Sequence, residues 1–252
     1  MTKCVLVTGG AKRVGAAISK RLAANGWRVA IHHNRSAADA ETLAKELGGV
    51  TVAADLADPG AASALPAQAQ KLLGAPLDAV VNNASVFEYN TIADLEISDW
   101  NRDLAVNLSA PVLITRAFAA SLGDMRTGAV VNMLDQKLWN LNADFFSYTV
   151  SKMALEGATR LLARALAPRM RVNSVAPGLS LPSGDQTQAE FDAVAGKYNL
   201  MRRPIDLEAL AGAVEFLLDN SAVTGQTIIA DNGQHMVASD HDVMFTTRGF
   251  KR

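Results

Sequence analysis

CVLVTGGAKRVG, residues 4–15, sets the architecture of the whole chain. A short apolar run, typical of a buried strand, enters a turn rich in glycine, and a helical pattern begins at once. Glycine allows a tight turn and a close approach of the backbone to a phosphate, while free N–H groups at the helix start favour an anion. The stretch predicts a dinucleotide site at Gly9, Arg13, Val14 and Gly15. An ordinary strand–helix turn is the alternative.

Outward from this unit, short apolar runs alternate with amphipathic helical patterns. The candidate strands are residues 4–8, 28–32, 50–54, 79–82, 129–133, 171–175 and 227–230. The candidate helices are residues 14–25, 37–47, 100–120, 146–166 and 207–218. Because the strands are almost continuously apolar and helices separate them, they predict a doubly wound parallel sheet with helices on both faces. We expect a single Rossmann-like α/β domain with seven strands over residues 1–252.

Local signals mark helix ends and irregular segments. Ser98 is the expected N-cap of the long central helix, and Gly26 is the expected stop of the first helix. Residues 178–200 begin with a stretch rich in glycine, proline and serine, which predicts an irregular substrate loop. Residues 237–252 form a polar tail for which the sequence predicts no regular structure.

Composition excludes several functional classes. A content of 49% hydrophobic and 19% charged residues is typical of a globular protein, and a net charge of -1 gives no footprint for nucleic acid or an anionic membrane. The single cysteine, Cys4, excludes an internal disulfide, and no residues at matching spacing make His32 or His33 metal ligands. We find no signal peptide and no apolar stretch of the roughly 18 residues that span a bilayer. We therefore expect a cytoplasmic protein without a metal, membrane or nucleic-acid partner.

The residues after the second predicted strand indicate which nicotinamide cofactor fits. A site for NAD usually ends this strand with Asp or Glu, which binds the ribose 2′-hydroxyl. The expected cofactor residues here are His33, Asn34, Arg35 and Ser36. Because no acid precedes Asp39, Arg35 and Ser36 are free to bind a 2′-phosphate, and Arg13 offers a second guanidinium. The sequence predicts NADPH, with a solvated surface arginine as the alternative.

Two further turns at the same edge of the sheet complete the expected cofactor site. Asp55 and Leu56 follow the third strand, where a carboxylate can accept a hydrogen bond from an adenine amino group. A helix N-terminal role for Asp55 is the alternative. Asn83, Ala84 and Ser85 follow the fourth strand, at the carboxyl edge where ligands of such sheets bind.

Tyr148 and Lys152 form the expected catalytic pair. Their spacing places both on one face of a predicted helix. A free tyrosine titrates near pH 10, so we expect the neighbouring ammonium to lower its pKa toward the working range. The lysine can also bind the nicotinamide ribose. We expect both Tyr148 and Lys152 to contact the cofactor.

These elements together resemble the short-chain dehydrogenase/reductase family over residues 3–236. The matching elements are residues 8–15, Asp55, residues 82–84, Asn107, Tyr148, Lys152 and residues 177–178. The resemblance implies hydride transfer between NAD(P) and a carbonyl or imine, and commonly a homotetramer. It also implies that Asn107 supports a water relay to Lys152.

Three departures from the general family resemble the pteridine reductases. Arg13 and Ser85 stand where glycines are usual, and Asp135 stands thirteen residues before Tyr148, where a serine is expected. That subfamily reduces dihydropterins, and in some members pterins and folates, with NADPH. The resemblance implies that Ser85 contacts the ligand and that Phe87 stacks on the pterin. The expected cofactor residues beyond the sixth strand are Pro177, Gly178 and Ser180.

The chemistry makes Asp135 reasonable at this position. A serine hydroxyl suits a ketone, whereas reducing a C=N bond of a pterin needs a proton on the ring nitrogen. Asp135 beside Tyr148 can relay that proton if its pKa is raised. A flat substrate gains from stacking between Phe87 and the nicotinamide. The alternatives are a loop-capping role for Asp135 and core packing for Phe87.

The sequence thus predicts an NADPH-dependent reductase of a pterin-type small molecule, with the proton delivered by Tyr148 and assisted by Asp135 and Lys152. A general ketone or 3-oxoacyl reductase is an alternative, against which Asp135 argues. A catalytically silent NADP-binding sensor is another, against which the intact Asn107, Tyr148 and Lys152 argue.

Overall fold

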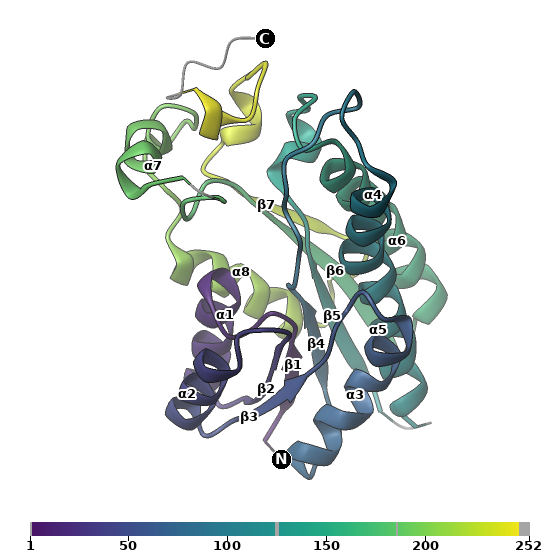
Figure 1. The fold of residues 1–252 in the computed structure, drawn as a ribbon. Helices are drawn as coiled ribbons and strands as arrows, with labels where there is room; N and C mark the ends of the chain where they lie inside the picture. The colour runs from purple at the N-terminus through teal and green to yellow at the C-terminus, as the bar shows by residue number, and fades with distance from the viewer. Residues whose placement is uncertain (1, 124–125, 185, 247–252) are drawn as a thin grey trace.

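The computed structural model describes residues 2–123, 126–184 and 186–246 (Figure 1). Within these residues, seven parallel strands form one sheet in the order β3-β2-β1-β4-β5-β6-β7, which confirms the predicted fold class. The strands are β1 Cys4–Val7, β2 Arg28–His33, β3 Val50–Ala53, β4 Ala79–Asn82, β5 Gly128–Met133, β6 Met170–Pro177 and β7 Thr227–Ala230. The helices are α1 Arg13–Ala24, α2 Ala37–Leu47, α3 Pro59–Leu73, α4 Ile97–Leu104, α5 Ala110–Ser121, α6 Phe146–Leu166, α7 Gln188–Ala195 and α8 Leu207–Asp219. The short turns are the π-helix η1 Ala105–Ser109 and the 3₁₀-helices η2 Gln136–Trp139, η3 Gln234–Met236 and η4 Val243–Phe245.

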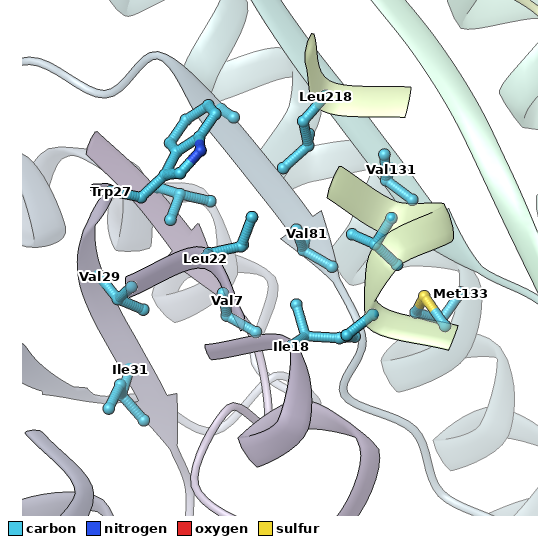
Figure 2. Packing of buried hydrophobic residues seen from close by; sticks show 14 of the residues in the cluster. Val7, Ile18, Leu22, Trp27, Val29, Ile31, Val81, Val131, Met133 and Leu218 are labelled. Atoms are coloured by element: carbon cyan, nitrogen blue, oxygen red, sulfur yellow. The ribbon is translucent and has the colours of Figure 1, made fainter. Parts of the chain in front are cut away.

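Apolar side chains alternate between the two faces of the sheet. In β1, Val5 and Val7 belong to a cluster with α1, α2 and α8, whereas Cys4 and Leu6 face α3, α5 and α6. Figure 1 shows these two helix groups on opposite sides of the sheet. Figure 2 shows the first cluster, where Trp27 closes one end. Coverage on both faces explains why the strands are apolar along their whole length.

Two predicted helix ends have different outcomes. Gly26 follows α1 with a φ of 85°, a conformation that favours glycine, so the predicted stop is confirmed. The predicted N-cap at Ser98 is wrong, because α4 begins at Ile97 and Glu96 occupies the cap position. Glu96 makes no side-chain cap bond, so this helix start lacks the local signal on which the prediction depended.

Two helices were missing from the sequence prediction. The helix α3 starts at Pro59, and Asp58 caps it by accepting a hydrogen bond from the Gly60 N–H. The helix α7 lies inside the segment 178–200, which we expected to be irregular. Thr187 and Glu190 form a capping box at its start. Both helices therefore have sequence signals at their starts, namely Asp-Pro for α3 and Thr-x-x-Glu for α7.

The continuous helical segment Ile97–Ser121 corrects the expectation about membrane-length segments. By length and composition alone it is apolar enough to cross a membrane, although the sequence analysis found no such stretch. Its polar residues Asp103, Asn107 and Thr115 are buried, and it packs against α3 and α6. A core helix of a globular domain has these same properties.

The topology brings the ends of β1 and β4 together. The strand order runs toward β3 on one side of β1 and toward β7 on the other, so the winding direction changes between β1 and β4. Ligands of open parallel sheets bind at the carboxyl edge beside such a change. The fold therefore predicts a site between residues 9–15 and residues 83–87.

Candidate active site

A cavity of about 650 Å³ lies at this edge of the sheet. The predicted site residues that line it are Gly9, Arg13, Val14, Gly15, His33, Asn34, Arg35, Ser36, Asp55, Leu56, Asn83, Ala84, Ser85, Phe87, Asp135, Tyr148, Pro177, Gly178 and Ser180. We call residues 9–15, 33–36 and 55–56 the cofactor end, and residues 85–87, 135–136, 148 and 242–243 the substrate end. Asn107 and Lys152 are buried, and neither is among the described residues that line the cavity.

Gly9 and Gly15 hold the cofactor end in a shape that no side chain would permit. A Cβ atom on Gly15 would lie 2.1 Å from the Gly9 carbonyl oxygen, and one on Gly9 would lie 3.0 Å from the Cα of Ala84. Asn83 fixes the loop from β4, because its amide donates to the carbonyl oxygens of Thr8 at 2.9 Å and Gly9 at 3.1 Å. The loop backbone is therefore held ready for close contact with a phosphate.

His32 ties three strand ends together beneath the same loop. Its Nδ1 accepts a hydrogen bond from the Gly9 N–H at 3.0 Å, and its Nε2 lies 3.1 Å from the carbonyl oxygen of Ala54. These contacts select the neutral ring with its proton on Nε2. Burial lowers the pKa of His32 to about 4. This position supports the expected packing role rather than a catalytic one.

The turn after β2 fits a 2′-phosphate. The His33 Nδ1 atom is buried and has no hydrogen-bond partner among the described residues. Arg35 makes no ion pair within the described part of the chain, and Ser36 precedes α2 without a side-chain cap bond. In contrast, Lys12 is already paired with Asp39 at 2.8 Å. The unengaged guanidinium and hydroxyl leave both groups available for a phosphate, and their contact with the 2′-phosphate of NADPH stays a prediction.

Arg13 links the glycine loop to the segment after β6. It has a φ of 53°, in the left-handed region that glycine adopts more readily. Its guanidinium donates to the carbonyl oxygen of Pro182 at 2.6 Å. Arg13 thus connects the loop to the expected substrate loop, and its role in binding the 2′-phosphate stays a prediction.

Asp55 lies in the turn between β3 and α3. Its carboxylate accepts a hydrogen bond from the Ala57 N–H at 3.0 Å, while Asp58 provides the cap of α3. Asp55 and Leu56 both line the cavity. An adenine contact stays open to Asp55, because its carboxylate still has acceptor capacity.

Asp135 and Tyr148 meet at the substrate end. The Tyr148 hydroxyl donates to Asp135 Oδ2 at 2.8 Å. The other carboxylate oxygen accepts from the Lys137 N–H at 2.8 Å and caps η2. Asp135 therefore has both of the roles that the sequence left open, since it caps the next turn and contacts the phenol.

The pKa values of this pair correct the sequence argument. We expected Lys152 to lower the pKa of Tyr148, but burial and the adjacent Asp135 raise it well above its usual value. Burial also raises the pKa of Asp135, as the proton-relay argument required. The Tyr148 hydroxyl consequently keeps its proton at neutral pH, and its role as the proton donor stays a prediction.

Lys152 and Asn107 support the pair from behind. The Lys152 ammonium donates to the Met133 carbonyl oxygen at 2.8 Å, and burial lowers its pKa to about 8. Asn107 lies in the π-helix η1, and its side chain bonds the backbone of Val86 and the hydroxyl of Ser151. It thereby fixes the segment after β4 against α6. Single-turn π-helices are frequent at functional sites, and the water relay to Lys152 stays a prediction.

Aromatic rings surround the substrate end. Phe87 stacks on Phe145 with ring centroids 3.9 Å apart and meets the Tyr148 ring edge-on at 4.7 Å. Phe245, in η4, stacks on Phe145 at 5.9 Å. Phe87 therefore packs in a cluster and also lines the cavity. Ser85 lines it too, and its hydroxyl donates to Asn107 Oδ1 at 3.0 Å.

Several residues of the cavity wall were missed by the sequence analysis. Gln136, Asp242 and Val243 line the substrate end. Asp242 belongs to a polar tail without periodicity, so no sequence signal marks it. Asp144 holds this tail in place by accepting a hydrogen bond from the Asp242 N–H at 2.7 Å. The rest of the predicted polar tail, residues 247–252, lies outside the described residues.

Known proteins are similar to this chain in sequence and in fold. A family model described as enoyl-(acyl carrier protein) reductase matches residues 9–235. Pteridine reductase 1 of Leishmania tarentolae is 32% identical, over 90% of this chain and 94% of that protein. The 3-oxoacyl-[acyl-carrier-protein] reductase FabG of Staphylococcus aureus is 29% identical, over 94% and 99%. The crystal structure of FolM alternative dihydrofolate reductase 1 from Brucella suis in complex with NADP is 41% identical, covers 94% of this chain and 96% of that one, and superimposes with a TM-score of 0.90.

Proposed function

The chain belongs to the short-chain dehydrogenase/reductase family and is an NADP-dependent oxidoreductase, and from this premise we propose that it reduces a dihydropterin to a tetrahydropterin. The observation that carries the proposal is the 2.8 Å hydrogen bond between Tyr148 and Asp135 in the cavity wall. The names of two relatives, a pteridine reductase and an alternative dihydrofolate reductase, support the same substrate class.

The reaction adds a hydride and a proton across one C=N bond of the substrate. NADPH bound at the cofactor end would supply the hydride for the carbon atom. Tyr148 gives its phenol proton to the nitrogen atom, and Asp135 helps to replace that proton. The raised pKa of Tyr148 suits this order, because the phenol keeps its proton until an acceptor arrives, and burial raises the pKa of Asp135 in the direction that a relay needs.

The surrounding residues position the substrate. Phe87 lines the cavity and contacts the Tyr148 ring edge-on, and Phe145 stacks on Phe87 and holds it in place. A planar pterin can stack on such a ring. Lys152, fixed by the Met133 carbonyl, contributes positive charge beneath the tyrosine when it is protonated.

The test is a steady-state assay of NADPH oxidation with dihydrobiopterin, dihydromonapterin, dihydrofolate and a panel of ketones. We expect turnover of at least one dihydropterin. Replacing Asp135 by the serine usual in the family should lower kcat/KM for the pterin about 10- to 100-fold, less than the loss of a direct proton donor. The affinity for NADPH should be unchanged. Unchanged pterin kinetics in Asp135→Ser would exclude the relay.

The same assay, extended to oxoacyl thioesters, separates the alternatives. Good activity on oxoacyl thioesters without turnover of dihydropterins would establish a 3-oxoacyl reductase, a function that the FabG relative also carries in its name. Tight NADPH binding without any turnover would establish a silent sensor.

Two expectations from the sequence complete the proposal. We propose a homotetramer, as is common in the family, and a cytoplasmic location. Sedimentation analysis of the purified protein tests the first, and fractionation of the native cells tests the second. A monomer in solution, or recovery of the protein with the membranes, would overturn the respective expectation.

A further inference from the structure

The start of α6 is fixed by a residue from a distant segment. The Asn90 carbonyl oxygen accepts a hydrogen bond from the Phe146 N–H at 3.0 Å, and the Asn90 side-chain oxygen accepts from the Ser147 N–H at 3.0 Å. An α-helix leaves such N–H groups without partners at its start. The residue that precedes the helix, Phe145, makes no side-chain cap bond. Asn90, which lies 57 residues before Ser147, therefore takes the place of a local cap.

The cap continues into a buried chain of hydrogen bonds. Asn90 Nδ2 donates to the Ser147 hydroxyl oxygen at 2.7 Å, and that hydroxyl donates to Asp103 Oδ2. Asn90 is 3% exposed, and Ser147 and Asp103 are fully buried. The other carboxylate oxygen of Asp103 lies 3.8 Å from Arg102 Nε. A buried hydrogen-bond chain rigidifies the elements that it joins, which here are the segment after β4, the helix α4 and the first turn of α6.

Phe145 enters this first turn in a strained conformation. Its φ is 54°, in the left-handed region that residues other than glycine rarely adopt. Its carbonyl oxygen accepts from the Thr149 N–H at 2.9 Å, and its ring stacks on Phe87. Such strain persists only where the surrounding structure restrains the backbone. The hydrogen bonds from Asn90 supply that restraint immediately before Tyr148.

We propose that Asn90, Ser147 and Asp103 are positioning residues that hold the Tyr148 hydroxyl in place for proton transfer. Ser147 directly precedes Tyr148, whose hydroxyl donates to Asp135 at 2.8 Å. The inference rests on the proposed role of Tyr148 as proton donor, but it is the same for a pterin and for a ketone. A misplacement of about 1 Å can lower a rate on the order of 100-fold. A first turn without this restraint would therefore slow proton transfer and leave the cofactor end unchanged.

The first test is Ser147→Ala, which interrupts the chain of hydrogen bonds and keeps the Tyr148 side chain. We expect kcat to fall about 10- to 100-fold, with the affinity for NADPH unchanged. A solvent deuterium isotope effect on kcat should accompany the loss, because a misplaced donor makes proton transfer rate-limiting. Thr115→Val is the matched control, because it removes an equally buried hydroxyl from α5, a helix with no described residue in the cavity wall. It should leave kcat unchanged.

The second test separates the hydrogen bond of Asp103 from its charge. Burial raises the pKa of this carboxyl, so an uncharged acceptor is compatible with the site. Asp103→Ala removes the acceptor and should lower kcat as Ser147→Ala does. Asp103→Asn keeps an oxygen atom that can accept from the Ser147 hydroxyl, and it should recover most of the kcat that Asp103→Ala loses. The double variant with both alanines should be no slower than either single variant, because both interrupt one network.

The outcomes distinguish this inference from the proposed function. Wild-type kcat in Ser147→Ala, or a loss of kcat without a solvent isotope effect, would overturn the inference. If Ser147→Ala does not fold, equal kcat values in Asp103→Asn and Asp103→Ala would overturn it. Turnover of a ketone or an oxoacyl thioester but of no dihydropterin would overturn the proposed substrate, and the same variants would then test the inference with the accepted substrate. Absence of any turnover by wild type would overturn both.

Discussion

The two ends of the cavity are built in different ways. At the cofactor end the backbone makes the site, through glycines that admit no Cβ and a neutral His32 that fixes the loop. At the substrate end side chains make the site, and they come from residues 85–87, 135–136, 148 and 242–243. Sequence patterns at strand ends mark the residues of the cofactor end, whereas the residues of the substrate end come from segments without such a pattern.

This difference separates binding from chemistry. The cofactor end contains the glycine loop, the His33 Nδ1 atom without a hydrogen-bond partner, and Arg35, which makes no ion pair in the described chain. Together these features fit a dinucleotide phosphate. The substrate end contains the buried proton donor and the aromatic wall. Mutations at one end should therefore change one kinetic parameter and spare the other.

The largest effect is expected for Tyr148→Phe. The variant keeps the ring that packs on Phe87 but removes the hydroxyl that donates the proton, so kcat should fall by roughly two to four orders of magnitude. Binding of NADPH, measured by fluorescence titration, should be nearly unchanged. Tyr198→Phe makes the same chemical change outside the cavity wall and should be silent. Wild-type turnover in Tyr148→Phe would show that chemistry does not reside at the substrate end.

The next effect concerns stability at the cofactor end. The pKa of His32 is lowered to about 4 in the folded state, so its contribution is complete above pH 6.5 and is lost as the pH falls toward 4. Relative to His32→Gln, wild type should lose about 2 to 3 kcal/mol of unfolding free energy between about pH 7 and pH 4.5. Urea titrations of both proteins at the two pH values measure this. The same pH dependence of the unfolding free energy in both proteins would contradict the stabilising role of neutral His32.

The smallest effect is expected for Arg35→Gln. Loss of a charge-assisted hydrogen bond to the 2′-phosphate should raise the KM for NADPH about 10-fold and leave the KM for NADH unchanged. Lys12→Gln should have a weaker effect, because the Lys12 ammonium is already paired with Asp39. An equal loss for both cofactors would show that Arg35 supports the loop rather than the phosphate.

Most of the fold could be predicted from the sequence, because the strands carry their own signal. All seven predicted strands overlap observed ones, since burial on both faces makes each run apolar. The boundaries of α2 and α6 agree with the prediction as well. The π-helix at Ala105–Ser109 could not be predicted, because an extra residue in a helical turn leaves the apolar pattern nearly intact.

The candidate site also divides into residues that the sequence predicts and residues that it does not. The cofactor residues follow strand ends in fixed order, so one chain can reveal them. The contact between Asp135 and Tyr148 was expected from a resemblance, and the structure brings the two groups together. The sequence did not predict Gln136 and Asp242 as site residues, because burial and tertiary packing, rather than spacing, bring them to the cavity. The pKa of Tyr148 is raised, whereas the sequence predicted that it would be lowered, because burial and the adjacent Asp135 disfavour the phenolate.

During translation the helical segment Ile97–Ser121 is synthesised before α6, the helix that covers its polar side. The helix α3 is already made, but α6, which supplies Ser147 and Ser151 as partners for Asp103 and Asn107, follows later in the chain. At ordinary elongation rates the intervening residues take on the order of seconds to synthesise. During that interval an apolar helix with unpaired polar groups is exposed on the nascent chain. The time for which it needs protection is therefore set by translation speed rather than by the folding rate of the finished protein.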